Sequence, residues 1–130
     1  MNVTSTDIGR RVLVIDDEKM IADTLALILR SEGYATEVAY DGSSGLASCN
    51  DFRPHLVISD VVMPGISGIE VAIELRQKFP NCTILLYSGQ AATAQMMEDA
   101  RSRGHDFELL AKPVHPARLL EKVRAMIGNA

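Results

Sequence analysis

The sequence predicts an α/β fold, in which five parallel strands form a doubly wound sheet that is covered by helices on both faces. Short apolar runs alternate five times along the chain with segments of helical periodicity, which is the pattern of such a sheet. Four of these runs lead directly into polar side chains of the kinds that carry chemistry. Because the carboxyl ends of parallel strands share one edge of the sheet, we expect these side chains to converge there.

Length and composition indicate one ordinary globular domain. The chain has 130 residues, enough for a single hydrophobic core, and a formal net charge of −4. That charge gives no electrostatic basis for binding nucleic acid, and no apolar run approaches the roughly 20 residues that would insert into a membrane. Residues 1–9 are polar and lack the apolar core of a signal peptide. We expect them to form a flexible tail ahead of a domain at residues 10–128, in the cytoplasm.

The first strand is predicted at residues 12–15, where four apolar side chains follow one another. An acidic triplet, residues 16–18, lies at its carboxyl end. Residues 19–32 are predicted to form a helix, because apolar side chains recur at helical spacing and Gly33 supplies a C-terminal stop. The stripe consists of Ile21, Leu25, Ile28 and Leu29.

The second strand and helix have weaker signals. Residues 36–40 are predicted to form a shorter strand, and the Asp-Gly pair that follows can turn the chain into a helix over residues 43–49. Gly45 lowers the helical propensity of that segment. Residues 51–54 are expected to be the loop before the next strand.

The central strand is predicted at residues 56–60, because an apolar run with β-branched side chains is typical of a strand buried on both faces. It ends at Asp60, a carboxylate that a buried strand would not carry without a function. A Met-Pro-Gly sequence then breaks the strand. Ser67 and Glu70 have the spacing of a capping box, so the third helix is predicted at residues 67–79.

The last two strands repeat the pattern. A strand at residues 83–87 leads into a serine, and a strand at residues 107–111 leads into a Lys-Pro pair. The fourth helix is predicted at residues 91–103, ahead of a glycine. The fifth is predicted at residues 116–127, with a proline that suits its first turn.

Together, the groups at the strand ends resemble those of a known family. Over roughly residues 10–127 the chain is similar to the receiver domain of bacterial two-component response regulators. The matching residues, in strand order, are Asp16 and Asp17, Asp60 with its Met-Pro-Gly, Ser88, and Lys112 with Pro113. The resemblance implies a flavodoxin-like, CheY-like sheet with strand order 2-1-3-4-5.

The resemblance also implies a magnesium site. In it, Asp17 and Asp60 ligate the ion directly, the backbone carbonyl of Val62 is a third ligand, and Asp16 acts largely through water. The chemistry of the residues agrees, since crowded carboxylates repel one another and a divalent cation with oxygen ligands relieves that repulsion.

By the same resemblance, Asp60 is the nucleophile that accepts a phosphoryl group from a histidine kinase or a histidine phosphotransfer protein. Lys112 and the hydroxyl of Ser88 bind two phosphoryl oxygens, and the metal binds the third. The bond between Lys112 and Pro113 is expected to be cis. The phosphorylated domain would then alter its binding to an unidentified downstream effector protein.

Each of these residues also has a simpler interpretation. Asp16 or Asp17 would serve equally well to cap the following helix, Ser88 would suit a turn, and Lys112 would be an ordinary solvated lysine. The simpler interpretations would require all of these residues to occur by coincidence, each at a strand end and in the family's order. We therefore favour the functional interpretation.

Three classes of function are weighed. The favoured one is a phosphoacceptor that catalyses its own phosphorylation and dephosphorylation and is not a turnover enzyme. A docking module that signals without phosphate is the alternative, although the intact acidic group argues against it. An aspartyl-phosphate phosphohydrolase is the third. Such enzymes have a motif similar to Asp-x-Asp, and Val62 stands where the second aspartate of that motif would be. Whether the chain is a stand-alone receiver or a part of a longer regulator is left open.

The chain departs from the family at the residue that usually reports phosphorylation. Three positions before Lys112 the family has Tyr or Phe, whereas this chain has Leu109. The stretch from Ser88 to Lys112 is also slightly longer than usual. We therefore predict that the backbone of residues 89–93 and the start of the fourth helix carry the response, with a glycine giving freedom.

The remaining reactive side chains have no pattern of a second site. Cys49 and Cys82 are too few and too far apart for a disulfide framework or a zinc site, and we expect two buried thiols. His55, His105 and His115 have no ligand spacing, so solvent-facing or capping roles are expected.

Overall fold

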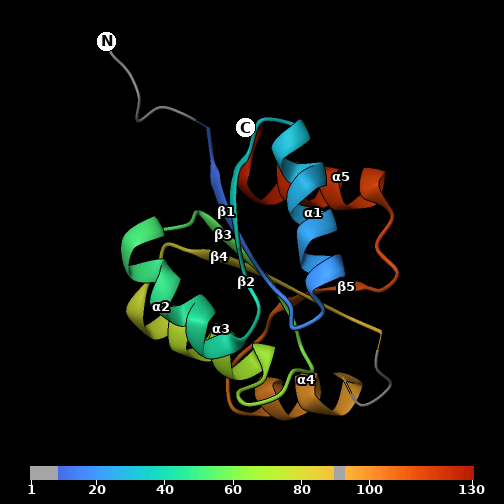
Figure 1. Cartoon of the computed structure of the whole chain (residues 1–130). Coiled ribbons are helices and arrows are strands. Elements are labelled where there is room, and N and C mark those ends of the chain that lie inside the picture. The colour runs from blue at the N-terminus through green and yellow to red at the C-terminus, as the bar shows by residue number, and fades with distance from the viewer. Residues whose placement is uncertain (1–8, 90–92) are drawn as a thin grey trace.

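The computed structural model describes residues 9–89 and 93–130, and over these residues it confirms the predicted α/β fold (Figure 1). Their five strands are β1 (Arg11–Ile15), β2 (Ala35–Ala39), β3 (Leu56–Asp60), β4 (Thr83–Ser88) and β5 (Glu108–Ala111). Their helices are α1 (Lys19–Ser31), α2 (Gly42–Phe52), α3 (Gly68–Lys78), α4 (Thr93–Ser102) and α5 (Pro116–Ile127). All neighbouring strands are parallel, and their order is β2-β1-β3-β4-β5, as the resemblance implied.

The sheet separates two hydrophobic cores. In β1, Leu13 and Ile15 pack with residues of α2, α3 and α4, whereas Val12 and Val14 pack with residues of α1 and α5. Figure 1 shows α1 and α5 together on one side of the sheet and α2 and α3 on the other. All five residues of β3 are buried, which confirms a central strand covered on both faces.

Helix α2 is longer than predicted. It begins where Asp41 accepts a hydrogen bond from the N–H of Ser44 and ends at Phe52, so the predicted loop at residues 51–54 is wrong for its first two residues. Gly45 has a packing function, because a Cβ atom there would overlap the side chain of Ile15 on β1. The glycine that weakens the helix in isolation therefore allows the helix to lie close to the sheet.

Most other boundaries agree with the sequence to within two residues. The capping box of α3 is confirmed, since Ser67 Oγ accepts from the N–H of Glu70 at 3.1 Å and Glu70 Oε1 accepts from the N–H of Ser67 at 2.9 Å. Strand β4 includes Ser88, and α5 begins at Pro116. Residues 91 and 92 of the predicted fourth helix, and residues 1–8 of the predicted tail, lie outside the described residues. In the described part of the chain, no helix is long and apolar enough to cross a membrane.

A tight turn joins the end of β3 to α3. The N–H of Gly68 donates to the carbonyl of Val61 at 2.9 Å, and a Cβ atom at Gly68 would overlap the carbonyl oxygen of Asp60. Only glycine fits this close approach. The first turn of α3 is thereby held against the strand end that carries Asp60.

Candidate functional site

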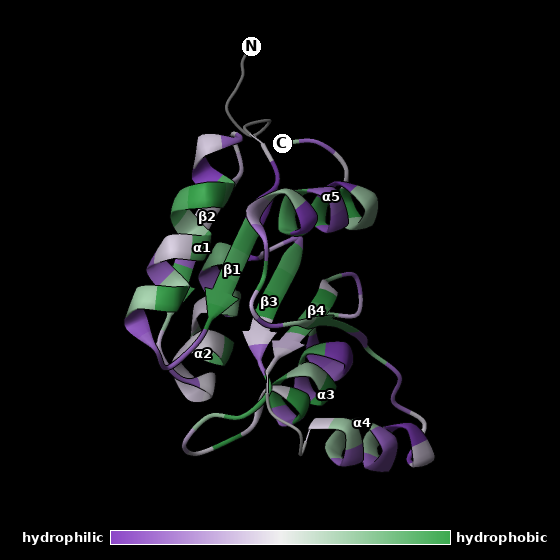
Figure 2. Ribbon diagram, turned by 90° about the vertical axis from the view of Figure 1, so that its right-hand side faces the viewer, coloured by the Kyte–Doolittle hydropathy of each residue, from purple (hydrophilic) through white to green (hydrophobic). Residues whose placement is uncertain are grey.

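The predicted site residues converge at the carboxyl edge of the sheet. Asp16 directly follows β1, Asp60 ends β3, Ser88 ends β4 and Lys112 directly follows β5. Because these strands are parallel, their ends meet at one edge. Figure 2 shows this edge as the change from hydrophobic to hydrophilic colouring at the tip of β3.

Three carboxylates of this edge lie close enough to share a cation. Asp16, Asp17 and Asp60 each offer an oxygen, and these atoms lie within 4.8 Å of one another. Asp16 and Asp60 are buried, whereas Asp17 is exposed. A set of oxygen ligands with one side open to water fits Mg²⁺, which takes oxygen ligands and usually keeps several waters. The residues therefore fit the metal that the sequence predicted.

The ammonium group of Lys112 lies among these carboxylates. Its Nζ is 3.3 Å from Asp16 Oδ2, 3.5 Å from Asp60 Oδ2 and 4.0 Å from Glu18 Oε1. The side chain is mostly buried, so the simpler interpretation of a solvated lysine is wrong. The bond between Lys112 and Pro113 is cis, as expected. One cation thus balances part of the negative charge of the cluster.

Asp60 is held in a defined orientation at the centre of the site. Its Oδ1 accepts a hydrogen bond from the N–H of Val61 at 2.9 Å, and its Oδ2 faces Lys112. Burial raises the pKa of the Asp60 carboxyl, Lys112 opposes that rise, and Asp16 adds to it. The Asp60 carboxylate is therefore less well solvated than an exposed aspartate, and titratable groups perturbed in this way cluster at functional sites.

Asp16 has two functions in this structure. Its Oδ1 accepts a hydrogen bond from the N–H of Glu18 at 2.9 Å, which closes a local turn just ahead of α1. The N-cap of α1 is Glu18, and it has no side-chain cap hydrogen bond, so the simpler interpretation of Asp16 as a helix cap is wrong. Its Oδ2 faces Lys112 and belongs to the acidic cluster. The local turn and the cluster share one side chain.

Ser88 is buried at the end of β4. Its Oγ lies 2.6 Å from Oγ1 of Thr93, the first residue of α4, which is also buried. Either hydroxyl can be the donor. No sequence pattern singles out Thr93, because its contact with Ser88 depends on how α4 is placed against β4.

Tyr87 is the main site residue that the sequence analysis missed. It is fully buried, its hydroxyl donates to Asp16 Oδ2 at 2.5 Å, and the Lys112 Nζ lies 4.7 Å from its ring centroid. Burial, together with the hydrogen bond to Asp16, raises the pKa of the Tyr87 hydroxyl, so the group stays a donor. Its one visible signal is a polar-tipped aromatic in an otherwise apolar strand.

Two further expectations concern residues at the rim of the site. Val62 exposes 40 % of its surface, and the role of its carbonyl as a metal ligand stays a prediction. Leu109 exposes 42 % of its surface on β5, so it does not fill a buried position in this state.

The histidines and cysteines lie apart from these groups. His115 accepts a hydrogen bond from the N–H of Ala117 at the start of α5, which confirms a capping role. His55 is half-buried, and its Nδ1 accepts from the N–H of Arg11. Cys49 is buried, whereas Cys82 is only partly so; burial raises their pKa values to about 11 and about 12.

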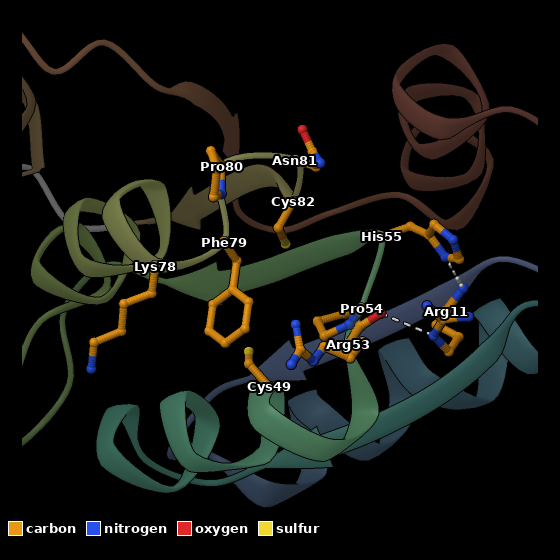
Figure 3. A pocket seen from close by; sticks show the side chains of 10 residues that line it. All are labelled: Arg11, Cys49, Arg53, Pro54, His55, Lys78, Phe79, Pro80, Asn81 and Cys82. Atoms are coloured by element: carbon orange, nitrogen blue, oxygen red, sulfur yellow. Dashed lines mark hydrogen bonds between the residues drawn. The ribbon is translucent and has the colours of Figure 1, made fainter.

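A pocket of about 290 Å³ lies at the opposite, amino edge of the sheet (Figure 3). Its cationic side chains are engaged by the protein itself. The Nε of Arg11 donates to two backbone carbonyls at the end of α2, Arg53 lies over the ring of Phe79, and Lys78 pairs with Glu74. We therefore place the chemistry at the carboxyl edge.

A mainly apolar groove of about 460 Å³ lies beside the acidic cluster. One wall is α1, the other is the segment that follows β5, and Lys112 lies at its border. Met20, at the start of α1, exposes 83 % of its surface there. An apolar surface next to a reactive group suits contact with a protein.

Comparison with known proteins agrees with this geometry. The family model of the response regulator receiver domain matches residues 12–124. The DNA-binding response regulator MtrA of Mycolicibacterium smegmatis is 34 % identical over 118 residues, which cover 91 % of this chain and 50 % of that protein. The chain therefore spans about half the length of such relatives.

Solved structures also match. A CheY-like receiver domain protein of Methanospirillum hungatei has a TM-score of 0.81 at 29 % identity, over 90 % of this chain and 92 % of that one. The response regulator TrrA of Thermotoga maritima, solved in complex with Mg(2+)-BeF, has a TM-score of 0.78 at 36 % identity, over 91 % and 99 %.

Proposed function

The chain belongs to the family of response regulator receiver domains of two-component signalling, and on this basis we propose that it accepts a phosphoryl group on Asp60 with the help of Mg²⁺. The observation that carries the proposal is the convergence of a buried, oriented carboxylate with two further carboxylates and a lysine ammonium 3.3–3.5 Å from two of them. Phosphoryl transfer needs mainly positioning and charge stabilisation, and this arrangement supplies both.

In the proposed reaction, a carboxylate oxygen of Asp60 attacks the phosphorus of a phosphohistidine. The P–O bond forms as the P–N bond to the donor breaks, and the released imidazole takes a proton from water. The N–H of Val61 orients the nucleophile, the Lys112 ammonium binds one phosphoryl oxygen, and the hydroxyl of Ser88 binds another. The product is an aspartyl phosphate.

Asp17 and Asp60, with the carbonyl of Val62, would hold the magnesium ion, and Asp16 would act through water. The ion would supply positive charge to the transferring phosphoryl group and relieve repulsion among the carboxylates. The relative TrrA supports this assignment, because its structure was solved in complex with Mg(2+)-BeF. A beryllium fluoride group resembles a phosphoryl group in shape.

The partners follow from the family and from the surface. We propose a histidine kinase or a histidine phosphotransfer protein as the donor, and the apolar groove beside Lys112 supports docking of such a protein. MtrA is a DNA-binding regulator, but the net charge of −4 gives this chain no electrostatic basis for binding DNA itself. Its output would therefore pass through a protein contact. The domain would not be a turnover enzyme, since it phosphorylates and dephosphorylates its own side chain.

The test is incubation with acetyl phosphate and Mg²⁺, followed by detection of an acid-stable, hydroxylamine-labile phosphate. Wild-type protein should be labelled stably, and Asp60→Asn should not be labelled while it keeps the fold. The matched control Asp51→Asn changes an exposed aspartate of α2 and should be labelled as wild type. Unlabelled wild type would favour the docking module, rapid turnover would favour a phosphohydrolase, and a labelled Asp60→Asn would refute the acceptor assignment.

A further inference from the structure

The hydrogen bonds that Asp16 accepts in this structure come from the protein itself. The residue has no exposed surface, its Oδ1 is satisfied by the N–H of Glu18, and its Oδ2 faces two donors. One is the hydroxyl of Tyr87 at 2.5 Å, and the other is the ammonium of Lys112 at 3.3 Å. The loss of all hydrogen-bond donors to a buried carboxylate oxygen strongly destabilises the folded protein.

This arrangement creates a conflict for Lys112. In the described structure its ammonium contacts Asp16 and Asp60, but in the proposed reaction it must bind a phosphoryl oxygen. If it were the sole protein donor to Asp16 Oδ2, its departure would leave that buried oxygen with no donor from the protein. The shorter hydrogen bond from Tyr87 prevents this.

We propose that Tyr87 is a positioning residue of the phosphorylation site, whose hydroxyl holds Asp16 and thereby releases the Lys112 ammonium for the phosphoryl group. The inference rests on the proposed function. The aromatic ring of Tyr87 also contributes to the site. The Lys112 Nζ lies 4.7 Å from the ring centroid, and at this distance an ammonium is attracted to the aromatic face. Tyr87 therefore contacts both the Asp16 carboxylate, which Lys112 must leave, and the Lys112 ammonium itself.

The variant Tyr87→Phe tests the hydroxyl, because it keeps the ring. With acetyl phosphate at saturating Mg²⁺, its maximal phosphorylation rate should fall roughly 10- to 100-fold, the scale of a hydrogen bond to a charged group. The Mg²⁺ concentration at half-maximal rate should change less than the rate, since the metal ligands are untouched. Tyr34→Phe is the matched control: that buried tyrosine donates to the carbonyl of Gly128, away from the site, and its variant should react as wild type.

A second measurement does not depend on phosphorylation. Chemical unfolding of Tyr87→Phe, Asp16→Ala and the double variant in metal-free buffer forms a double-mutant cycle. The destabilisation caused by Tyr87→Phe should largely disappear in the Asp16→Ala background. A tyrosine that only fills space would give additive effects.

The outcomes separate the two proposals. Labelled wild type with an equally fast Tyr87→Phe, or additive stabilities in the cycle, would overturn the role of Tyr87 and leave the proposed function standing. Wild type that takes no phosphate would overturn the proposed function and, with it, the role of Tyr87 in the reaction, even where the cycle shows a coupled pair.

Discussion

The hydrogen bond between Ser88 and Thr93 should hold the domain in its unphosphorylated state. The two hydroxyl oxygens are 2.6 Å apart, and both residues are buried. To bind a phosphoryl oxygen, the hydroxyl of Ser88 has to turn toward the acidic edge and leave Thr93. Thr93→Val removes this one partner and keeps the shape of the side chain, while Ser88 retains a further contact.

The size of the effect follows from the bond that is lost. A hydrogen bond between neutral groups contributes about 1 kcal/mol, so Thr93→Val should lower the free energy of unfolding by that amount and the Tm by about 4 °C for a domain of this size. The same 1 kcal/mol shifts the equilibrium between the two orientations of Ser88 by roughly fivefold. Beryllium fluoride with Mg²⁺, which mimics the phosphorylated state, should therefore bind about fivefold more tightly.

The first assay is a titration of the protein with beryllium fluoride at fixed Mg²⁺, in which binding is monitored by backbone amide shifts. The second is a thermal unfolding curve without ligands. Thr93→Ser keeps the hydroxyl and is the control that should stay near wild type. Destabilisation of Thr93→Val with unchanged or weaker beryllium fluoride binding would refute the reasoning, because the lost bond would then not oppose the phosphorylated state.

Three further variants test other parts of the site. Asp17→Ala should lose most Mg²⁺ affinity and phosphorylation, and it should raise the Tm in metal-free buffer by relieving like-charge repulsion; Mg²⁺ affinity equal to wild type would mean that the metal site is misplaced. Gly68→Ala should lower the free energy of unfolding by about 3 kcal/mol in denaturant titrations, because its Cβ would overlap the carbonyl oxygen of Asp60, and a loss below about 1 kcal/mol would contradict that packing. Leu109→Ala should preserve the amide shifts that a phosphoryl mimic causes in residues 89–93; their loss would identify Leu109 as the switch.

Sequence patterns were sufficient for the elements and for the edge of the sheet that carries the site. Four of the five apolar runs end in a polar group of a particular type, and parallel strands bring such ends together whatever the details of packing. The capping box of Ser67 and Glu70 and the start of α5 at Pro116 were also readable, because they depend on residues a few positions apart. The sequence patterns are thus sufficient to identify Asp16, Asp17, Asp60, Ser88 and Lys112 as candidate site residues.

Contacts between distant segments needed the tertiary structure. The hydroxyl of Tyr87 reaches Asp16 across 71 residues of sequence, and no local pattern identifies Asp16 as its partner. Gly45 reads as a weak point of α2 until its approach to Ile15 is seen. The strand order was implied by the family resemblance and is shown by the structure. The sequence by itself determined which groups arrive at the carboxyl edge, because that depends only on where each strand ends and on the strands being parallel. Only the packing of side chains decided which of them hold one another there, because hydrogen bonds depend on tenths of an ångström that no spacing in the sequence encodes.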